Sequence, residues 1–150
     1  MARFTGTIDE LCSVDVSELV KWMTPIPVKE WLKMADASFR GWGEIFRPLA
    51  TDLTERFYPG CMVSGVGIFV LEPGQVHPAH RDEQPEEWVS RVHVPIFSNE
   101  NATATMDDGE HAMEVGKAYR FNTLATHAVA NGGASFRAHF VFDIHQSVRT

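Results

Sequence analysis

The sequence predicts a mostly β protein in which N-terminal helices precede an all-β sandwich or small barrel. Up to Phe57, apolar residues recur at spacings of three and four, which is typical of amphipathic helices. After Pro59 and Gly60 the period becomes two, and turn-forming residues interrupt the chain at short intervals. Many short strands with such turns are typical of a sandwich or a barrel.

The first part of the chain is expected to form three helices. The helical pattern covers residues 16–23, 28–39 and 44–57, and a glycine-containing break at residues 41–43 separates the last two. The aromatic stripe of these later helices is expected to pack against the sheet. The first strand is expected at residues 62–71, where Val, Ile and Phe are frequent.

The composition limits the partners of the protein. The 150 residues carry a formal net charge of -7 at pH 7, which argues against general binding to nucleic acid or to a membrane surface. The chain has no apolar run long enough to span a bilayer and no signal-peptide pattern, so we expect a cytoplasmic protein. Cys12 and Cys61 could form one disulfide, but free thiols fit a core-forming domain better. The seven histidines are numerous, and histidine is the commonest metal ligand.

Three expected strands, at residues 76–82, 91–96 and 135–143, carry polar side chains opposite their apolar residues. A half-solvated antiparallel sheet would explain this alternation. Its outer face, however, usually carries Thr, Lys, Glu or Ser rather than His and Arg. The alternative is that these faces line the mouth of a barrel and converge on a metal and an anionic ligand. The polar positions are His80, Asp82, Arg91, His93, Arg137, His139 and Asp143.

One subset of these residues has the composition of an iron site. Non-haem Fe(II) oxygenases hold the metal with two histidines and one carboxylate, and leave the other positions open. His80 and Asp82 are two residues apart, so they project to the same side of a strand. His127 is the candidate for the second histidine. A hairpin at residues 131–134 is expected to run its strand antiparallel to the strand of Arg137, which could then bind a ligand carboxylate near the metal.

The sequence around these residues resembles the aspartyl/asparaginyl β-hydroxylase family. This family belongs to the Fe(II)/2-oxoglutarate-dependent dioxygenases and includes bacterial amino-acid hydroxylases that act on proline. The resemblance covers roughly residues 60–145, and the N-terminal third is similar only in kind. The segments that carry it are residues 72–82, 91–95, 116–131 and 137–143.

The resemblance implies a double-stranded β-helix, the jelly-roll or cupin-like fold. We expect one domain over residues 1–150, with a helical part at 1–58 that packs on the sheet and the β-helix core at 59–150. It also implies that Fe(II) and 2-oxoglutarate are the cofactors. The implied iron ligands are His80, Asp82 and His127, and the implied 2-oxoglutarate-binding residues are Arg137, His93 and His139.

Two further residues are candidates for contact with the substrate. The resemblance implies that Arg91 holds a carboxylate, either of the substrate or of 2-oxoglutarate. Trp88 is expected in a loop, from which it would cover the site or contact the substrate, and simple packing is an equal alternative. Residues left without a functional role are His77, His111 and His145, together with Asn122 and Asn131, which are expected to be structural.

The expected reaction is hydroxylation of an amino acid, or of an Asp-, Asn- or Pro-type side chain, with decarboxylation of 2-oxoglutarate to succinate. The substrate is either a small molecule or a peptide or protein side chain, and the oligomeric state stays open. One alternative is a cupin-type metalloenzyme in which His77 is a ligand, although strand alternation places His77 opposite His80 unless the strand bulges. The other alternative is a non-catalytic jelly-roll module that binds a ligand.

Overall fold

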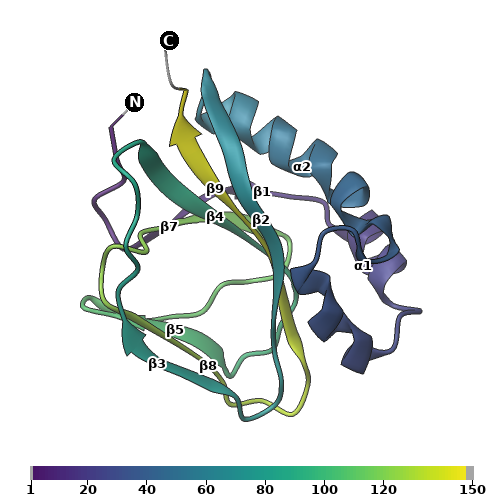
Figure 1. Ribbon diagram of the computed structural model, residues 1–150. Helices are drawn as coiled ribbons and strands as arrows, with labels where there is room; N and C mark the ends of the chain where they lie inside the picture. The colour runs from purple at the N-terminus through teal and green to yellow at the C-terminus, as the bar shows by residue number, and fades with distance from the viewer. Residues whose placement is uncertain (1, 148–150) are drawn as a thin grey trace.

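The computed structural model describes residues 2–147 and contains an N-terminal helical layer and two β-sheets (Figure 1). Two of the helices, η1 (Val28–Ala35) and the short η2 (Phe39–Gly41), are of the 3-10 type. The elements in chain order are β1 (Ile8–Ser13), α1 (Ser17–Met23), η1 (Val28–Ala35), η2 (Phe39–Gly41), α2 (Trp42–Phe57), β2 (Cys61–Leu71), β3 (Val76–His80), β4 (Trp88–Phe97), β5 (Ala102–Met106), β6 (Gly109–His111), β7 (Lys117–Phe121), β8 (His127–Asn131) and β9 (Arg137–Gln146).

The helices follow the sequence pattern with one change. The amphipathic segment expected as a single helix at residues 28–39 forms the 3-10 helix η1, which ends at Ala35. The break expected at residues 41–43 lies slightly earlier, at Arg40 and Gly41, whose φ angles are 52° and 68°. This left-handed conformation interrupts the helical hydrogen bonding and lets α2 start in a new direction.

The strands form two antiparallel sheets, a five-stranded sheet in the order β1-β7-β4-β9-β2 and a four-stranded sheet in the order β3-β8-β5-β6. The predicted class, mostly β with N-terminal helices, is confirmed. One strand was not expected, because β1 lies within the part predicted to be helical and pairs with β7. Its six residues show no clean alternation, so the sequence pattern alone did not reveal it.

The expected pairing of the strands that hold His127 and Arg137 is wrong. Strand β8, which begins with His127, belongs to the four-stranded sheet, whereas β9, which begins with Arg137, belongs to the five-stranded sheet. The connection between them crosses from one sheet to the other. Asn131 holds this crossing, because its buried Nδ2 donates to the carbonyl oxygens of Leu71 and Ser135 at 3.0 and 2.8 Å. The structural role expected of Asn131 is therefore confirmed.

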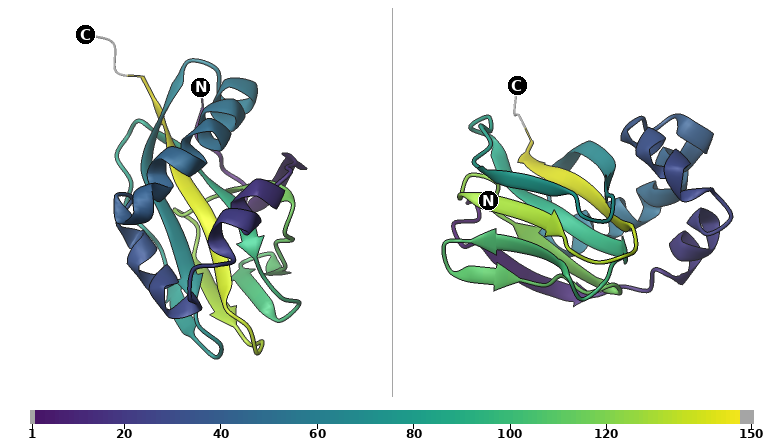
Figure 2. Two further views of the ribbon diagram at one scale, coloured as in Figure 1. Left: turned by 90° about the vertical axis from the view of Figure 1, so that its right-hand side faces the viewer. Right: turned by 90° about the horizontal axis from the view of Figure 1, so that it is seen from below.

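The main core lies between the helices and one face of the larger sheet (Figure 2). The rings of Phe46 and Phe140 lie 5.0 Å apart, and Trp42 packs edge-on against Phe140. Val92 and Val94 belong to the same cluster and are fully buried. Since strand residues alternate between faces, the opposite face of β4 and β9 points towards the smaller sheet. The polar residues on that face therefore lie between the two sheets.

Two other sequence expectations can be compared with the described residues. Cys12 and Cys61 are free cysteines, as expected. Within residues 2–147, no helix combines the length and the apolar character needed to cross a membrane.

Candidate metal centre

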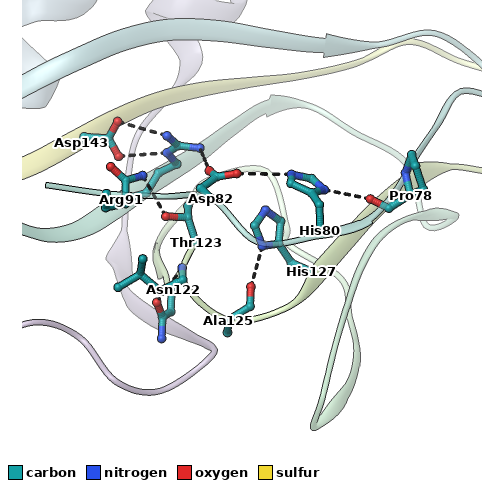
Figure 3. Close-up of polar contacts among 11 residues, drawn as sticks. Pro78, His80, Asp82, Arg91, Asn122, Thr123, Ala125, His127 and Asp143 are labelled. Atoms are coloured by element: carbon teal, nitrogen blue, oxygen red, sulfur yellow. Dashed lines mark hydrogen bonds and ion pairs between the residues drawn. The ribbon is translucent and has the colours of Figure 1, made fainter.

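Three predicted ligands meet at the end of the smaller sheet (Figure 3). His80 is the last residue of β3, and His127, the first residue of β8, is its direct partner in the antiparallel register. Asp82 follows β3 by two residues, and its backbone N–H donates to the carbonyl oxygen of Thr123 at 2.9 Å. One nitrogen or oxygen atom from each of the three side chains lies within 4.8 Å of the other two. The structure thus brings His80, Asp82 and His127 together.

Hydrogen bonds orient both imidazole rings for metal binding. His80 Nδ1 lies 2.8 Å from the carbonyl oxygen of Pro78, and His127 Nδ1 lies 2.8 Å from that of Ala125. A carbonyl oxygen only accepts, so each Nδ1 carries the proton and each Nε2 keeps its lone pair. This is the arrangement by which metal-binding histidines are fixed in one tautomer. Burial lowers the pKa of His127, which favours the neutral form that binds a metal.

The donor set fits ferrous iron. Two imidazole nitrogens and one carboxylate oxygen, without a thiolate, match the two-histidine, one-carboxylate sites of non-haem iron oxygenases. Asp82 is oriented as well, because Arg91 Nη1 lies 3.3 Å from its Oδ2. Oδ1 lies 3.4 Å from His80 Nε2, on the side where the other ligand atoms are. The residues present could therefore hold Fe(II).

A cavity of about 410 Å³ opens beside this triad and contains a buried cation. Arg137 lines the cavity with only 5% of its surface exposed, and among the described residues no carboxylate lies within ion-pair distance of it. Burial lowers the pKa of Arg137 to about 10, which still leaves the guanidinium charged at neutral pH. A buried charge without a counter-ion is costly, so this position favours an anionic ligand.

Two buried histidines lie next to Arg137: His139 contacts it directly, and His93 contacts His139. The Arg137 Nε–H donates to His139 Nε2 at 3.1 Å, and His139 Nδ1 lies 3.1 Å from His93 Nδ1. His93 lines the cavity, but His139 does not. The side chain of His139 is enclosed between Arg137 and His93, so its expected place beside the cosubstrate stays a prediction. Burial, followed by the charge of Arg137, lowers the pKa of both histidines well below the usual range.

These two histidines predict a loss of stability at acid pH. An unfolded histidine binds a proton below about pH 6.5, whereas buried His93 and His139 stay neutral, so stability is lost as the pH falls below that value. The free energy of unfolding is therefore expected to fall between about pH 6.5 and about pH 5.5 because of these two groups. Urea unfolding at the two pH values measures it, and His139→Gln should remove about half of the fall. An equal fall in the variant would contradict the prediction.

The two residues expected to contact the substrate, Trp88 and Arg91, have surroundings that differ from the sequence prediction. Trp88 is the first residue of β4 rather than part of a loop, and it is fully buried, so it does not reach the cavity. Its Nε1–H donates to Asp143 Oδ1 at 3.1 Å. Arg91 lines the cavity, but its guanidinium is already paired with Asp143 and Asp82. Asp143 was recognised in the sequence as a polar residue on the strand face of Arg137 and His139, but no role was assigned to it.

The outer wall of the cavity also differs from the sequence expectation. His77 was expected opposite His80, but the register shifts between them and both line the cavity. His77 is still not one of the grouped ligand residues, and its Nε2 lies 3.2 Å from Gln75 Nε2. Leu32 from η1 and Phe69 from β2 add exposed apolar surface to the wall, and no local motif indicated either of them.

The His-X-Asp pair, His80 and Asp82, together with His127 forms the ligand set that is typical of non-haem iron oxygenases. Comparison with family models finds a match over residues 47–147, to the family described as Aspartyl/Asparaginyl beta-hydroxylase. The match covers more than half of the chain, so the protein belongs to the aspartyl/asparaginyl β-hydroxylase family. The resemblance stated from the sequence is confirmed. Among curated proteins, no sequence matches.

Several solved structures share the fold of this chain. A prolyl-4-hydroxylase from Pseudomonas putida has 11% identity and a TM-score of 0.62, over 96% of this chain and 95% of that one. A viral collagen prolyl hydroxylase from Paramecium Bursaria Chlorella virus-1, in its 2OG complex, has 10% identity and a TM-score of 0.65, over 96% and 98%. The apo form of the non-heme monooxygenase ThoJ has 13% identity and a TM-score of 0.65, over 95% and 75%. These likenesses confirm the double-stranded β-helix fold.

Proposed function

We propose that the protein is an Fe(II)- and 2-oxoglutarate-dependent dioxygenase that hydroxylates an amino acid or an Asp-, Asn- or Pro-type side chain. One observation carries the proposal: the His80, Asp82 and His127 group shares its cavity with Arg137, a buried guanidinium without a carboxylate partner among the described residues. A metal site next to an anion site suits a cosubstrate that binds the metal at one end and carries a carboxylate at the other.

The triad would hold Fe(II), which together with 2-oxoglutarate and oxygen supplies oxidation of an unactivated C–H bond and releases succinate and carbon dioxide. Arg137 binds the distal carboxylate of 2-oxoglutarate through its guanidinium fork, and the enclosed His139 keeps that fork in place. The interaction is strong because the site is buried and little water competes for the charge.

Phe121 lines the cavity between His93 and the candidate metal ligand His127. Its ring stacks on His93 at 4.8 Å and meets His127 edge-on at 5.2 Å. It is 2% exposed, so it contributes a buried apolar surface to the cavity wall. The phenyl ring also limits how the two imidazoles can turn, which preserves the geometry of the cavity wall.

Succinate formation tests the proposal. Purified protein is supplied with Fe(II), ascorbate and 2-oxoglutarate, and succinate is measured by mass spectrometry in the presence of free amino acids and of Asp-, Asn- or Pro-containing peptides. We expect formation that requires Fe(II) and rises with one substrate set, with a matching mass increase of one oxygen in the substrate. Absence of succinate in every mixture, although the protein is folded and loaded with metal, would favour a non-catalytic binding module.

The cupin alternative differs in one ligand. If His77 were a metal ligand, His77→Ala would weaken metal binding as strongly as a change in the triad. The proposal expects no such loss, because His77 is outside the grouped ligand residues.

A further inference from the structure

Asp143 is a buried carboxylate that is fully engaged by two residues of β4. It lies on β9 with 7% of its surface exposed. Arg91 binds it with two nitrogens, Nε at 3.0 Å from Oδ1 and Nη2 at 3.2 Å from Oδ2. Trp88 Nε1 donates to Oδ1 at 3.1 Å. These three donors fix the position of the carboxylate, and the two-point contact fixes the plane of the guanidinium.

The same guanidinium reaches the candidate metal ligand Asp82. Because Arg91 Nε and Nη2 are occupied by Asp143, Nη1 points to Asp82 Oδ2 at 3.3 Å (Figure 3). A guanidinium is rigid and planar, so fixing one edge determines where the other donors lie. A continuous chain of contacts therefore leads from β9 through β4 to the carboxylate of the triad.

Strand β2 is shaped to leave room for Asp143. The pairing of β2 with β9 shifts register between Ser64 and Gly67, and Gly65 lies there with a φ of 58°. A Cβ atom at Gly65 would lie 2.6 Å from Asp143 Oδ2, which is too close for any side chain. The bulge and the glycine thus accommodate this carboxylate, and the contact is part of the fold rather than an incidental surface pair.

Asp143 and Asp82 both contact the guanidinium of Arg91, and their charges explain this arrangement. Without Asp143, Arg91 would pair with Asp82 alone and would draw the Asp82 oxygens away from the metal position. With Asp143 as its main partner, Arg91 makes only one contact to Asp82 and leaves the other oxygen, Oδ1, for the metal. The same pairing already uses three of the five N–H donors of Arg91.

We propose that Asp143 is a positioning residue of the metal centre: through Arg91 it orients the Asp82 carboxylate for metal binding. The proposal rests on the proposed function, since it requires Asp82 to be a metal ligand. Residues that orient first ligands typically contribute 10- to 100-fold to metal affinity. Arg91 joins the two carboxylates and shares this positioning role.

Titration with Co(II) as the only added ligand tests this role. Isothermal calorimetry gives the Kd, and the visible absorption of bound Co(II) reports the ligand set. Asp143→Asn should raise the Kd by about 10- to 100-fold and change the spectrum. Asp9→Asn is the matched control, because Asp9 also pairs with an arginine, Arg120, but on the exposed strand β1. The control should bind Co(II) as the unmodified protein does.

Two milder variants keep the test decisive if Asp143→Asn does not fold. Trp88→Phe keeps an aromatic side chain but removes the donor to Asp143 together with part of the buried indole, and Arg91→Lys retains the charge and removes the planar fork. Both should raise the Kd of Co(II), while the KM for 2-oxoglutarate changes little because Arg137 is intact. Equal Co(II) affinity in all folded variants would overturn the positioning role. Failure of the unmodified protein to bind Co(II) would instead overturn the proposed function.

Discussion

His127→Ala is expected to abolish succinate formation and to remove tight metal binding. His127 is buried in the wall of the cavity, its Nδ1 is held by Ala125, and its Nε2 faces the other two ligand residues. Alanine removes one of three protein ligands and leaves no polar atom that could replace it. The measurement is succinate release at saturating Fe(II), together with calorimetric titration of Co(II) into the metal-free variant.

His77→Ala is the matched control for this substitution. His77 lines the same cavity on the neighbouring part of β3 but does not belong to the ligand group. The control should keep Co(II) affinity near that of the unmodified protein. If His77→Ala lost metal binding and His127→Ala retained it, the ligand assignment would be reversed in favour of the cupin arrangement.

Arg137→Gln is expected to weaken 2-oxoglutarate binding by roughly 30- to several-thousand-fold, which corresponds to about 2–5 kcal/mol for loss of one partner of a buried charge pair. Glutamine keeps a hydrogen-bonding group but has neither the charge nor the fork of the guanidinium. Calorimetric titration of 2-oxoglutarate into Co(II)-loaded protein measures the effect. Co(II) binding itself should be unchanged, because Arg137 is not among the ligand residues.

The melting temperature of Arg137→Gln provides a second check, because it is not expected to fall together with ligand affinity. Burial lowers the pKa of Arg137, which means that the folded state without ligand penalises its charge. Removing that charge should leave the melting temperature unchanged or raise it, even though ligand binding is lost. The exposed Arg120→Gln serves as the control for ligand binding. A strong loss of stability in Arg137→Gln with intact 2-oxoglutarate affinity would show that Arg137 is structural.

The triad could be predicted because its signal is local. A His-X-Asp pair on a strand places both side chains on one face by geometry alone, and His127 was added from its spacing along the chain and from the family resemblance. The change of period near Pro59 likewise predicts the order of helices and sheets. These features depend on neighbouring residues, and sequence periodicity reports on such neighbours directly.

The remaining features depend on which strands pair, and periodicity does not contain that information. The pairing of β1 with β7 joins segments from opposite ends of the chain, and β8 and β9 separate into different sheets despite the short turn between them. The register shift that moves His77 into the cavity was foreseen only as an exception. Asp143 had a visible sequence signal, but its partners Arg91 and Trp88 come from another strand.

The position of β3 implies that metal binding should make this strand less prone to local opening. This strand lies at the edge of the smaller sheet, pairs only with β8, and has no buried residue. Segments with few buried contacts open more readily than the rest of a fold, and a ligand that bridges two segments favours their closed state by mass action. Iron bound between His80 and His127 would connect β3 to β8 across their register, so amide exchange along β3 should slow as the protein is loaded.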